Sequence, residues 1–348
     1  MRKILGLVLT TLLAALGLGA QTPKESLLVL SKHDHTLAVV DPATLKVVAK
    51  MPVGDDPHEV IATADGKRAY VSNYGGGGAG ALHTLAVIDL VNQKALAPID
   101  LVALKGPHGL DFAGGKVWFT AEAAKAFGSV DPATGKVDFI LGSGQNRTHM
   151  IFVAQDLSKI FTSNIQSGTL SIWEKVSPTL PSGPPPPGAG APPPGAFPPE
   201  WNQSLVEVGA GSEGFDVTQD GKQLWAANAQ KGTIAVVSIA EKKVVQTIEA
   251  NVRGANRLKF TPDGKLAFVS SLNGANVAVF DVAGRKELKR IPVGHGAAGI
   301  QMQPNGARAF VACTPDDYVV VIDLKTLEVT AKVDAGGNPD GMAWTIQQ

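Results

Sequence analysis

Cysteine, aromatic residues and net charge are all scarce in this chain of 348 residues. The single cysteine, Cys313, excludes an internal disulfide, and we expect it to be a small buried residue rather than a metal ligand or a reactive thiol. Aromatic residues make up 6% of the chain, and Lys plus Arg equals Asp plus Glu at 31 each. A chain without net charge has no electrostatic footprint for nucleic acid or an anionic membrane, so we expect neither partner.

The N-terminus reads as an export signal. Arg2 and Lys3 precede an apolar run from Ile4 to Ala20, after which the sequence becomes polar. This order predicts a signal peptide over residues 1–20 and a periplasmic or secreted protein without a membrane span after cleavage. A membrane anchor is the alternative, although a spanning helix usually needs about 20 apolar residues.

Glycine is abundant, at 39 residues, and much of it belongs to an internal repeat. Seven related segments recur: Pro57-His58-Glu59-Val60, Pro107-His108-Gly109-Leu110, Thr148-His149-Met150-Ile151, Ser212-Glu213-Gly214-Phe215, Ala255-Asn256-Arg257-Leu258, Ala297-Ala298-Gly299-Ile300 and Pro339-Asp340-Gly341-Met342. The last four begin 43, 42 and 42 residues apart. Self-similarity at this period indicates one supersecondary unit used repeatedly.

Each unit contains four apolar segments separated by turns, and no helical period is present after residue 20. Turns such as Asp263-Gly264 suit two-residue hairpins, and runs such as Tyr318–Ile322 are typical of buried strands. Seven four-stranded antiparallel units predict an all-β, seven-bladed β-propeller in a single domain over residues 26–346. The last unit stops after its first strand, Gly341–Thr345, which we expect to complete a blade with the three N-terminal strands. A two-domain β protein is the alternative.

One unit is interrupted by a proline-rich insertion over residues 177–201, which contains Pro184–Pro187 and Pro192–Pro194. Such a composition favours polyproline II or disorder over a packed element. We expect a tolerated surface insertion, with a docking segment for a protein partner as the alternative.

Two resemblances follow from these repeats. The strand Tyr70–Asn73 and the turn Pro262–Lys265 resemble the YVTN family of exported bacterial seven-bladed propellers, over nearly all of the chain after residue 20. That resemblance implies the fold, and the family includes lactonase-like and binding proteins. One unit, with Gly106–Leu110, Val117–Glu122 and Asp131–Gly135, resembles a repeat of the streptogramin (virginiamycin B) lyases. Those enzymes use a His base and Mg²⁺, but the other units depart from their pattern, so we transfer no catalytic residue.

The first strand of each propeller blade lines the central channel, so equivalent residues of the seven segments should ring one mouth. These residues are His58, His108, His149, Glu213, Asn256, Ala298 and Asp340. Three imidazoles and a carboxylate on successive blades suit Zn²⁺, Cu²⁺ or Fe²⁺, and the lyase resemblance adds Mg²⁺. We therefore predict a metal site of His58, His108, His149 and Glu213, in which His108 and His149 are candidate catalytic residues. Plain blade corners, each bonded to a neighbouring loop, are the alternative.

Loops on the same face add polar groups, and all seven histidines fall on this rim. The predicted ligand-binding residues are Tyr74, His83, Glu122, Arg147, Asn256, Arg257, His295 and Asp340. The glycine run Gly75–Gly80 is not a P-loop, because no Gly-Lys-Ser/Thr follows it. We expect it to be a plain long loop, with a flexible flap over the pocket as the alternative.

These observations favour an exported, monomeric propeller with a His-rich small-ligand or metal site. If the protein is an enzyme, lyase or lactone hydrolase chemistry fits best, with a His as general base and a metal polarising the carbonyl. The alternative is a non-catalytic scaffold that presents its rim to a protein or polysaccharide at the cell surface.

Overall fold

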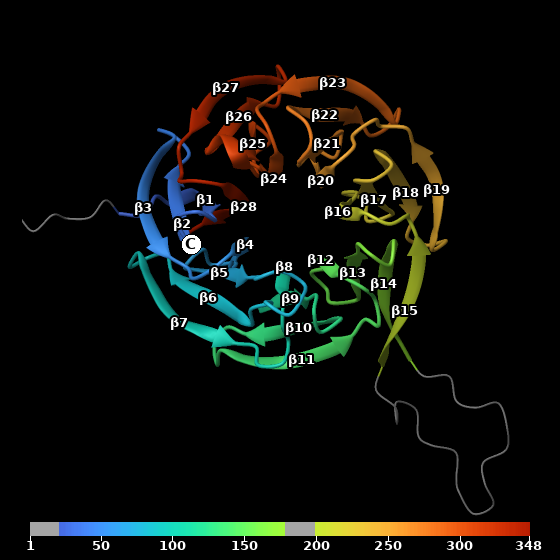
Figure 1. Ribbon diagram of the computed structural model, residues 1–348, viewed down its shortest axis with the longest axis horizontal. Coiled ribbons are helices and arrows are strands. Elements are labelled where there is room, and N and C mark those ends of the chain that lie inside the picture. Colours follow the sequence, from blue (N-terminus) through green and yellow to red (C-terminus); the bar gives the residue numbers. More distant parts are fainter. Residues whose placement is uncertain (1–20, 178–198) are drawn as a thin grey trace, which may run out of the picture.

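The computed structural model, which describes residues 21–177 and 199–348, is a ring of seven four-stranded antiparallel sheets (Figure 1). This confirms the predicted seven-bladed β-propeller. The predicted signal peptide and most of the proline-rich insertion lie outside the described residues. Within the described residues, no helix is long and apolar enough to cross a membrane.

The strands of each blade are given from the channel outward. The closing blade contains β28 (Pro339–Ile346), β1 (Glu25–Ser31), β2 (Thr36–Asp41) and β3 (Lys46–Pro52). The next three blades contain β4 (Pro57–Ala62), β5 (Arg68–Asn73), β6 (Thr84–Asp89) and β7 (Lys94–Asp100); β8 (Pro107–Ala113), β9 (Lys116–Ala121), β10 (Ala126–Asp131) and β11 (Lys136–Gly142); and β12 (Thr148–Val153), β13 (Lys159–Asn164), β14 (Thr169–Val176) and β15 (Glu200–Glu207).

The last three blades complete the ring. They contain β16 (Ser212–Val217), β17 (Gln223–Asn228), β18 (Thr233–Ser238) and β19 (Lys243–Ile248); β20 (Ala255–Phe260), β21 (Leu266–Ser271), β22 (Asn276–Asp281) and β23 (Lys286–Pro292); and β24 (Ala297–Met302), β25 (Arg308–Cys313), β26 (Tyr318–Asp323) and β27 (Glu328–Val333). A short 3₁₀ turn, Thr314–Asp316, separates β25 from β26.

The two ends of the chain close the ring in one blade, as the sequence predicts. β28 pairs antiparallel with β1, with Leu27 opposite Trp344 and Leu28 opposite Ala343. This pairing removes the free sheet edges that an open ring would expose.

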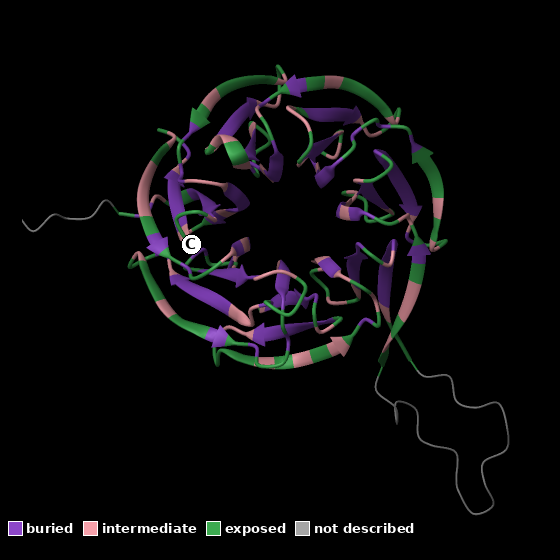
Figure 2. Cartoon of the chain, in the orientation of Figure 1, coloured by how far each residue is buried: buried purple, intermediate pink, exposed green. Residues whose placement is uncertain are grey.

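The core lies between neighbouring blades. Second and third strands such as β5 and β6 are buried along most of their length, whereas the outer strand β7 is largely exposed (Figure 2). Trp225 of one blade packs in the same buried cluster as Leu258 and Val269 of the next. Strands buried on both faces need continuous apolar runs, which explains the repeated Val-, Ile- and Ala-rich segments. Cys313 is one of these buried residues, and burial raises the pKa of its thiol to about 12.

Glycines on the inner strands allow neighbouring blades to approach closely at the channel. A Cβ at Gly109 would lie 2.5 Å from the His149 carbonyl oxygen and 2.8 Å from the Cα of Met150. The backbone at Gly109 has no unusual φ angle, so glycine is needed here for space alone. This close approach brings the side chains of successive inner strands together.

The hairpin that flanks the proline-rich insertion is longer than the sequence suggested. Glu200 and Trp201, assigned to the insertion, lie in β15, where Trp201 pairs with Lys175 of β14. The Lys175 ammonium also lies 5.1 Å from the centre of the Trp201 ring, a contact that favours extension of the ladder.

Candidate functional site

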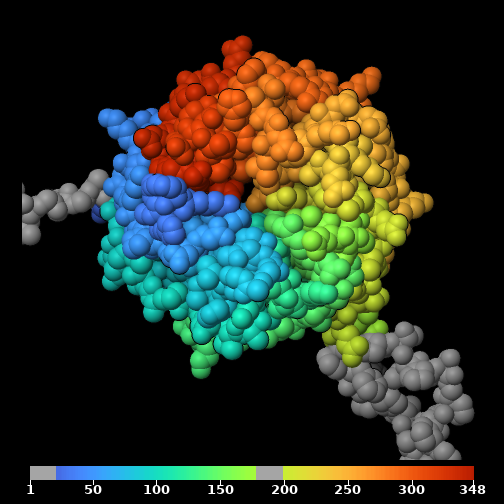
Figure 3. Space-filling model, viewed as in Figure 1, coloured from blue at the N-terminus to red at the C-terminus, as the bar shows by residue number. Residues whose placement is uncertain are grey.

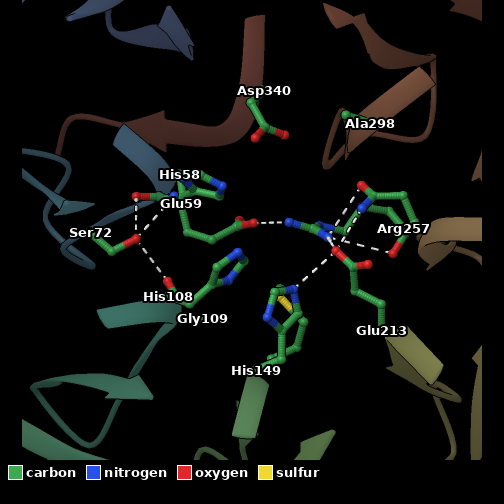
Figure 4. Close-up of polar contacts among 12 residues, drawn as sticks. His58, Glu59, Ser72, His108, Gly109, His149, Glu213, Arg257, Ala298 and Asp340 are labelled. Atoms are coloured by element: carbon green, nitrogen blue, oxygen red, sulfur yellow. Dashed lines mark hydrogen bonds and ion pairs between the residues drawn. The ribbon is translucent and has the colours of Figure 1, made fainter. Parts of the chain in front are cut away.

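Successive inner strands place histidines at one mouth of the channel. His58, His108 and His149 are each the second residue of β4, β8 and β12. Their rings and the carboxylates of Glu213 and Asp340 are directed toward one central space (Figure 4). A small hollow remains at the centre of the ring in the space-filling view (Figure 3). We call His58, His108, His149, Glu122 and Glu213 the histidine cluster.

His108 contacts both of the other imidazoles. The ring centres of His108 and His149 are 3.6 Å apart, with 33° between their planes, and those of His58 and His108 are 4.9 Å apart. The Tyr74 ring stands edge-on to both His58 and His108, at 4.7 and 4.9 Å. His108 and His149 are each only 2% exposed, so they lie recessed below the rim.

His149 is held between two carboxylates. Its Nδ1 donates a hydrogen bond to Glu122, and its Nε2 lies 3.0 Å from the Glu213 carboxylate. Burial alone would lower the pKa of His149, but the charges and hydrogen bonds of Glu213 and Glu122 outweigh burial and raise it. Burial would likewise raise the pKa of Glu213, yet the charge of His149 overcomes this effect and lowers it to about 2. The arrangement therefore favours an imidazolium between two carboxylates.

His108 has the opposite environment. Its Nδ1 is buried and has no hydrogen-bond partner among the described residues. Burial lowers the pKa of His108 well below its ordinary value, and the neighbouring charge of His149 lowers it further. His108 is therefore a neutral imidazole stacked on a charged one.

The second oxygen of Glu122 is also bound. It accepts a hydrogen bond from the Tyr74 hydroxyl, and Nε of Arg147 lies 3.3 Å away. Burial and the bond to Glu122 raise the pKa of Tyr74, so this hydroxyl stays protonated. Glu122 is fully buried and is fixed from three directions, which orients His149.

His58 faces the closing blade. The Lys32 ammonium lies 2.8 Å from its Nε2 and 2.5 Å from Asp340 Oδ2. On the other side, Nδ1 of His58 lies 3.2 Å from Asp56 Oδ1. Since the ammonium can only donate, Nε2 of His58 accepts and Nδ1 carries the proton toward Asp56.

The floor of the cluster is an ion pair across the channel. Arg257 of β20 bonds to Glu59 of β4, on the far side of the ring, and its Nη1 lies 3.4 Å from Glu213 (Figure 4). Asn256 donates to the same Glu213 oxygen at 2.7 Å. Burial would lower the pKa of Arg257, but the Glu59 and Glu213 charges raise it, so the guanidinium remains charged.

The predicted metal ligands lie together, but the nitrogens of two of the three histidines, His58 and His149, face protein partners. Both nitrogens of His149 face carboxylates, and Nε2 of His58 faces the Lys32 ammonium. Within residues 21–177 and 199–348, no group of three His, Cys, Asp or Glu side chains is arranged to hold a metal ion. A metal bound here would require these hydrogen bonds to be exchanged.

Of the predicted ligand-binding residues, two stand apart from the cluster. His83 is bonded to Asp100 at 2.8 Å, and His295 lies 3.2 Å from Asp316; both rings are largely exposed on rim loops. Tyr74, Glu122, Arg147, Asn256, Arg257 and Asp340 all contact or adjoin the cluster.

Three residues of the site were missed from the sequence: Lys32, Asp56 and Glu59. A signal for Lys32 exists, because it directly follows the second strand of its blade, as Tyr74 and Glu122 do in the next two blades. Glu59 and Arg257 occupy the same position of their inner strands, where four of the other blades have glycine. Opposite charges at this position would have predicted the ion pair.

The arrangement supplies the parts of an acid–base site. A neutral imidazole with a free nitrogen can accept a proton, and the adjacent cations of His149 and Lys32 can stabilise negative charge. Pairs of titratable groups with opposite pKa shifts are typical of catalytic sites.

No protein-family model matches the chain, and no curated protein does either. Solved structures do match. A functionally unknown protein from Desulfotomaculum acetoxidans has 12% identity and a TM-score of 0.71, with 93% of this chain and 99% of that one covered. A candidate 6-phosphogluconolactonase from Bacteroides uniformis has 14% identity and a TM-score of 0.70, and the match covers 93% of this chain and 100% of that one. A candidate 6-phosphogluconolactonase from Bacteroides fragilis has 16% identity and a TM-score of 0.68, and the match covers 93% of this chain and 99% of that one. At these identities the similarity establishes the fold, a seven-bladed propeller shared with lactonase-like neighbours.

Proposed function

We propose that the histidine cluster is an acid–base site that binds a small polar molecule and opens a lactone ring by hydrolysis. One observation carries this proposal: two stacked imidazoles differ in their hydrogen bonding. His149 has a carboxylate at each nitrogen, whereas Nδ1 of His108 has no partner among the described residues. A neutral base beside a fixed cation suits hydrolysis of an ester, because the base can accept a proton from water and the cation can stabilise the oxyanion.

In the proposed reaction His108 is the general base. It removes a proton from water as the water oxygen attacks the lactone carbonyl carbon. The ring C–O bond then breaks, and His108 returns the proton to the departing ring oxygen, which yields a hydroxy acid. The charges of His149 and Lys32 stabilise the oxyanion that forms in between.

The accessible part of the site suggests a hydroxylated substrate. Lys32, Arg147 and Glu213 have side chains 26%, 36% and 21% exposed, and they present both donors and acceptors at the mouth. Such a rim suits a sugar lactone better than an apolar one. The two candidate 6-phosphogluconolactonases with the same fold support this choice.

A metal-assisted form of the same site is the second version of this proposal. His58, His108, His149 and Glu213 would hold Zn²⁺, Cu²⁺, Fe²⁺ or Mg²⁺, which would polarise the carbonyl. It differs from the first version in one measurable way, because chelation would abolish activity.

Turnover of a lactone panel by the purified protein tests the proposal. The panel contains glucono-δ-lactone, 6-phosphogluconolactone, γ-butyrolactone and a cyclic depsipeptide, each with and without chelator. We expect hydrolysis of a sugar lactone and a loss of about 10²–10⁴-fold in His108→Ala. His33→Ala is the matched control, because His33 is an exposed rim histidine whose side chain bonds to the adjacent Asp34. Absence of turnover, or equal rates in His108→Ala and wild type, would contradict the proposal.

A further inference from the structure

A cavity system opens on the face opposite the histidine cluster. Its outer part, of about 1100 Å³, lies among the turns that follow the inner strands, including Asp65, Gly114 and Pro304. A narrower part, of about 300 Å³, continues along the channel. Ile61 and Trp344 line both parts, so the two parts form one funnel. We call the narrower part the lower chamber.

The lower chamber is separate from the histidine cluster. Glu59 and Arg257 line its upper end, and their ion pair crosses the channel between β4 and β20. None of His58, His108 and His149 lines it. A ligand would therefore enter this chamber from the opposite face.

Two carboxylates are fixed in the wall of the chamber. Asp111 accepts backbone hydrogen bonds from Phe112 at 2.7 Å and from Val153 of the next blade at 2.6 Å. Asp216 has the same pattern, with bonds from its own strand and from the following blade. These bonds hold the carboxylates in place without neutralising them.

The charges in the chamber do not balance. Its lining contains the carboxylates Glu59, Asp111 and Asp216, but only two cations, Arg257 and Lys259. Glu59 pairs with Arg257, and Lys259 lies 3.9 Å from Asp216. Asp111 has no ion-pair partner within the described part of the chain; burial raises its pKa, and the charge of Lys259 offsets this effect only in part. A cation beside it would relieve that cost.

The remaining wall is apolar and partly aromatic. Met150, Phe152 and Trp344 line the chamber and are each partly exposed to it. Trp344 also has a buried Nε1 without a hydrogen-bond partner among the described residues. Aromatic faces attract cations and also cover apolar groups.

We propose that the lower chamber binds an organic monocation, an amine with an apolar body, whose ammonium group lies against Asp111. The aromatic and methionine side chains contact the body of the ligand. The Asp111 carboxylate, which has no ion-pair partner among the described residues, selects the charge, and the size of the chamber limits the ligand to a small molecule.

Calorimetric titration of the full chain tests this proposal. The probe is phenethylammonium, with 2-phenylethanol as its neutral analogue and phenylacetate as its anionic one. We expect phenethylammonium to bind at least about tenfold more tightly than either analogue, because both lack the charge that Asp111 attracts.

Two variants locate the site. Asp111→Asn should weaken phenethylammonium binding by about tenfold or more, and its retained amide oxygen can still accept a backbone bond. Ile61→Lys should abolish binding by placing a competing ammonium in the funnel, without altering Asp111. Asp100→Asn, which removes a carboxylate on the opposite face, should bind like wild type. Equal affinity for the charged and neutral probes, unchanged binding in Ile61→Lys, or no binding at millimolar concentration would overturn the proposal.

Discussion

Lys32 and Asp340 come from opposite ends of the chain, yet the Lys32 ammonium lies 2.5 Å from the Asp340 carboxylate. Lys32 directly follows β1, and Asp340 belongs to β28, the strand that pairs with β1 to close the ring. Lys32 also contacts Nε2 of His58 in the neighbouring blade. The closure of the propeller and the assembly of the histidine cluster therefore share one ammonium group.

Removal of that ammonium should weaken the fold as well as the site. Lys32→Met leaves the Asp340 carboxylate, which is only 8% exposed, without its partner. We expect the free energy of unfolding to fall by about 1–3 kcal/mol. Urea denaturation measures this free energy. The double variant Lys32→Met/Asp340→Asn should recover part of the loss seen in Lys32→Met. A double variant that is less stable than the sum of both single changes would contradict the pairing.

Glu122 should keep His149 charged. Because the folded pKa of His149 is raised, its protonation stabilises the protein fully below the ordinary value of about 6.5, and this stability is lost as pH rises through the raised value. Glu122→Gln removes one of the carboxylates that raise the pKa of His149. As pH rises above about 6.5, we therefore expect this variant to lose less stability than the wild type loses.

Urea denaturation at a series of pH values checks this dependence. The control is Glu241→Gln, which removes an exposed carboxylate paired with Lys243. The same slope of stability against pH in wild type and Glu122→Gln would show that His149 is not held charged by Glu122.

The inner-strand glycines should be intolerant of any side chain. Gly109→Ala would bring a Cβ to 2.5 Å from a backbone oxygen of the next blade. We expect a loss of about 1–3 kcal/mol in the free energy of unfolding. Gly142→Ala is the matched control, because that position, also in a strand, has nothing within 4 Å of the added Cβ and no positive φ. Equal stability of the two variants would rule out the close approach of the inner strands.

The metal-assisted version makes a separate prediction about composition. Elemental analysis of wild type should show a divalent metal that the His58/His108/His149→Ala triple variant has lost. Equal metal content in both would end that version and leave the acid–base version intact, because the latter relies only on the chain's own residues.

The architecture was predictable because the repeat fixes it. The short last unit ending in Gly341–Thr345 predicted that the C-terminal strand would complete the first blade, and β28 does so. The second residue of each inner strand likewise predicted that His58, His108, His149 and Glu213 would meet. Positions that recur in every blade are equivalent in space, and this equivalence is what a sequence repeat reports.

The partners of those residues were less predictable, because they depend on distances from the axis. His83 and His295 lie on the predicted face, but loop residues on that face can be far from the channel, and both bond to nearby aspartates instead. Glu59 was overlooked because its neighbour His58 occupies the position compared across blades. The pairing of Glu59 with Arg257 depends on which blades face each other across the ring.

The proposed acid–base chemistry depends most on the protonation of the two stacked imidazoles, and ¹⁵N NMR of the histidine side chains at neutral pH measures that protonation directly. We predict that both nitrogens of His149 carry protons and that His108 retains one unprotonated nitrogen. A neutral His149, or a His108 with protons on both nitrogens, would contradict the proposed acid–base site.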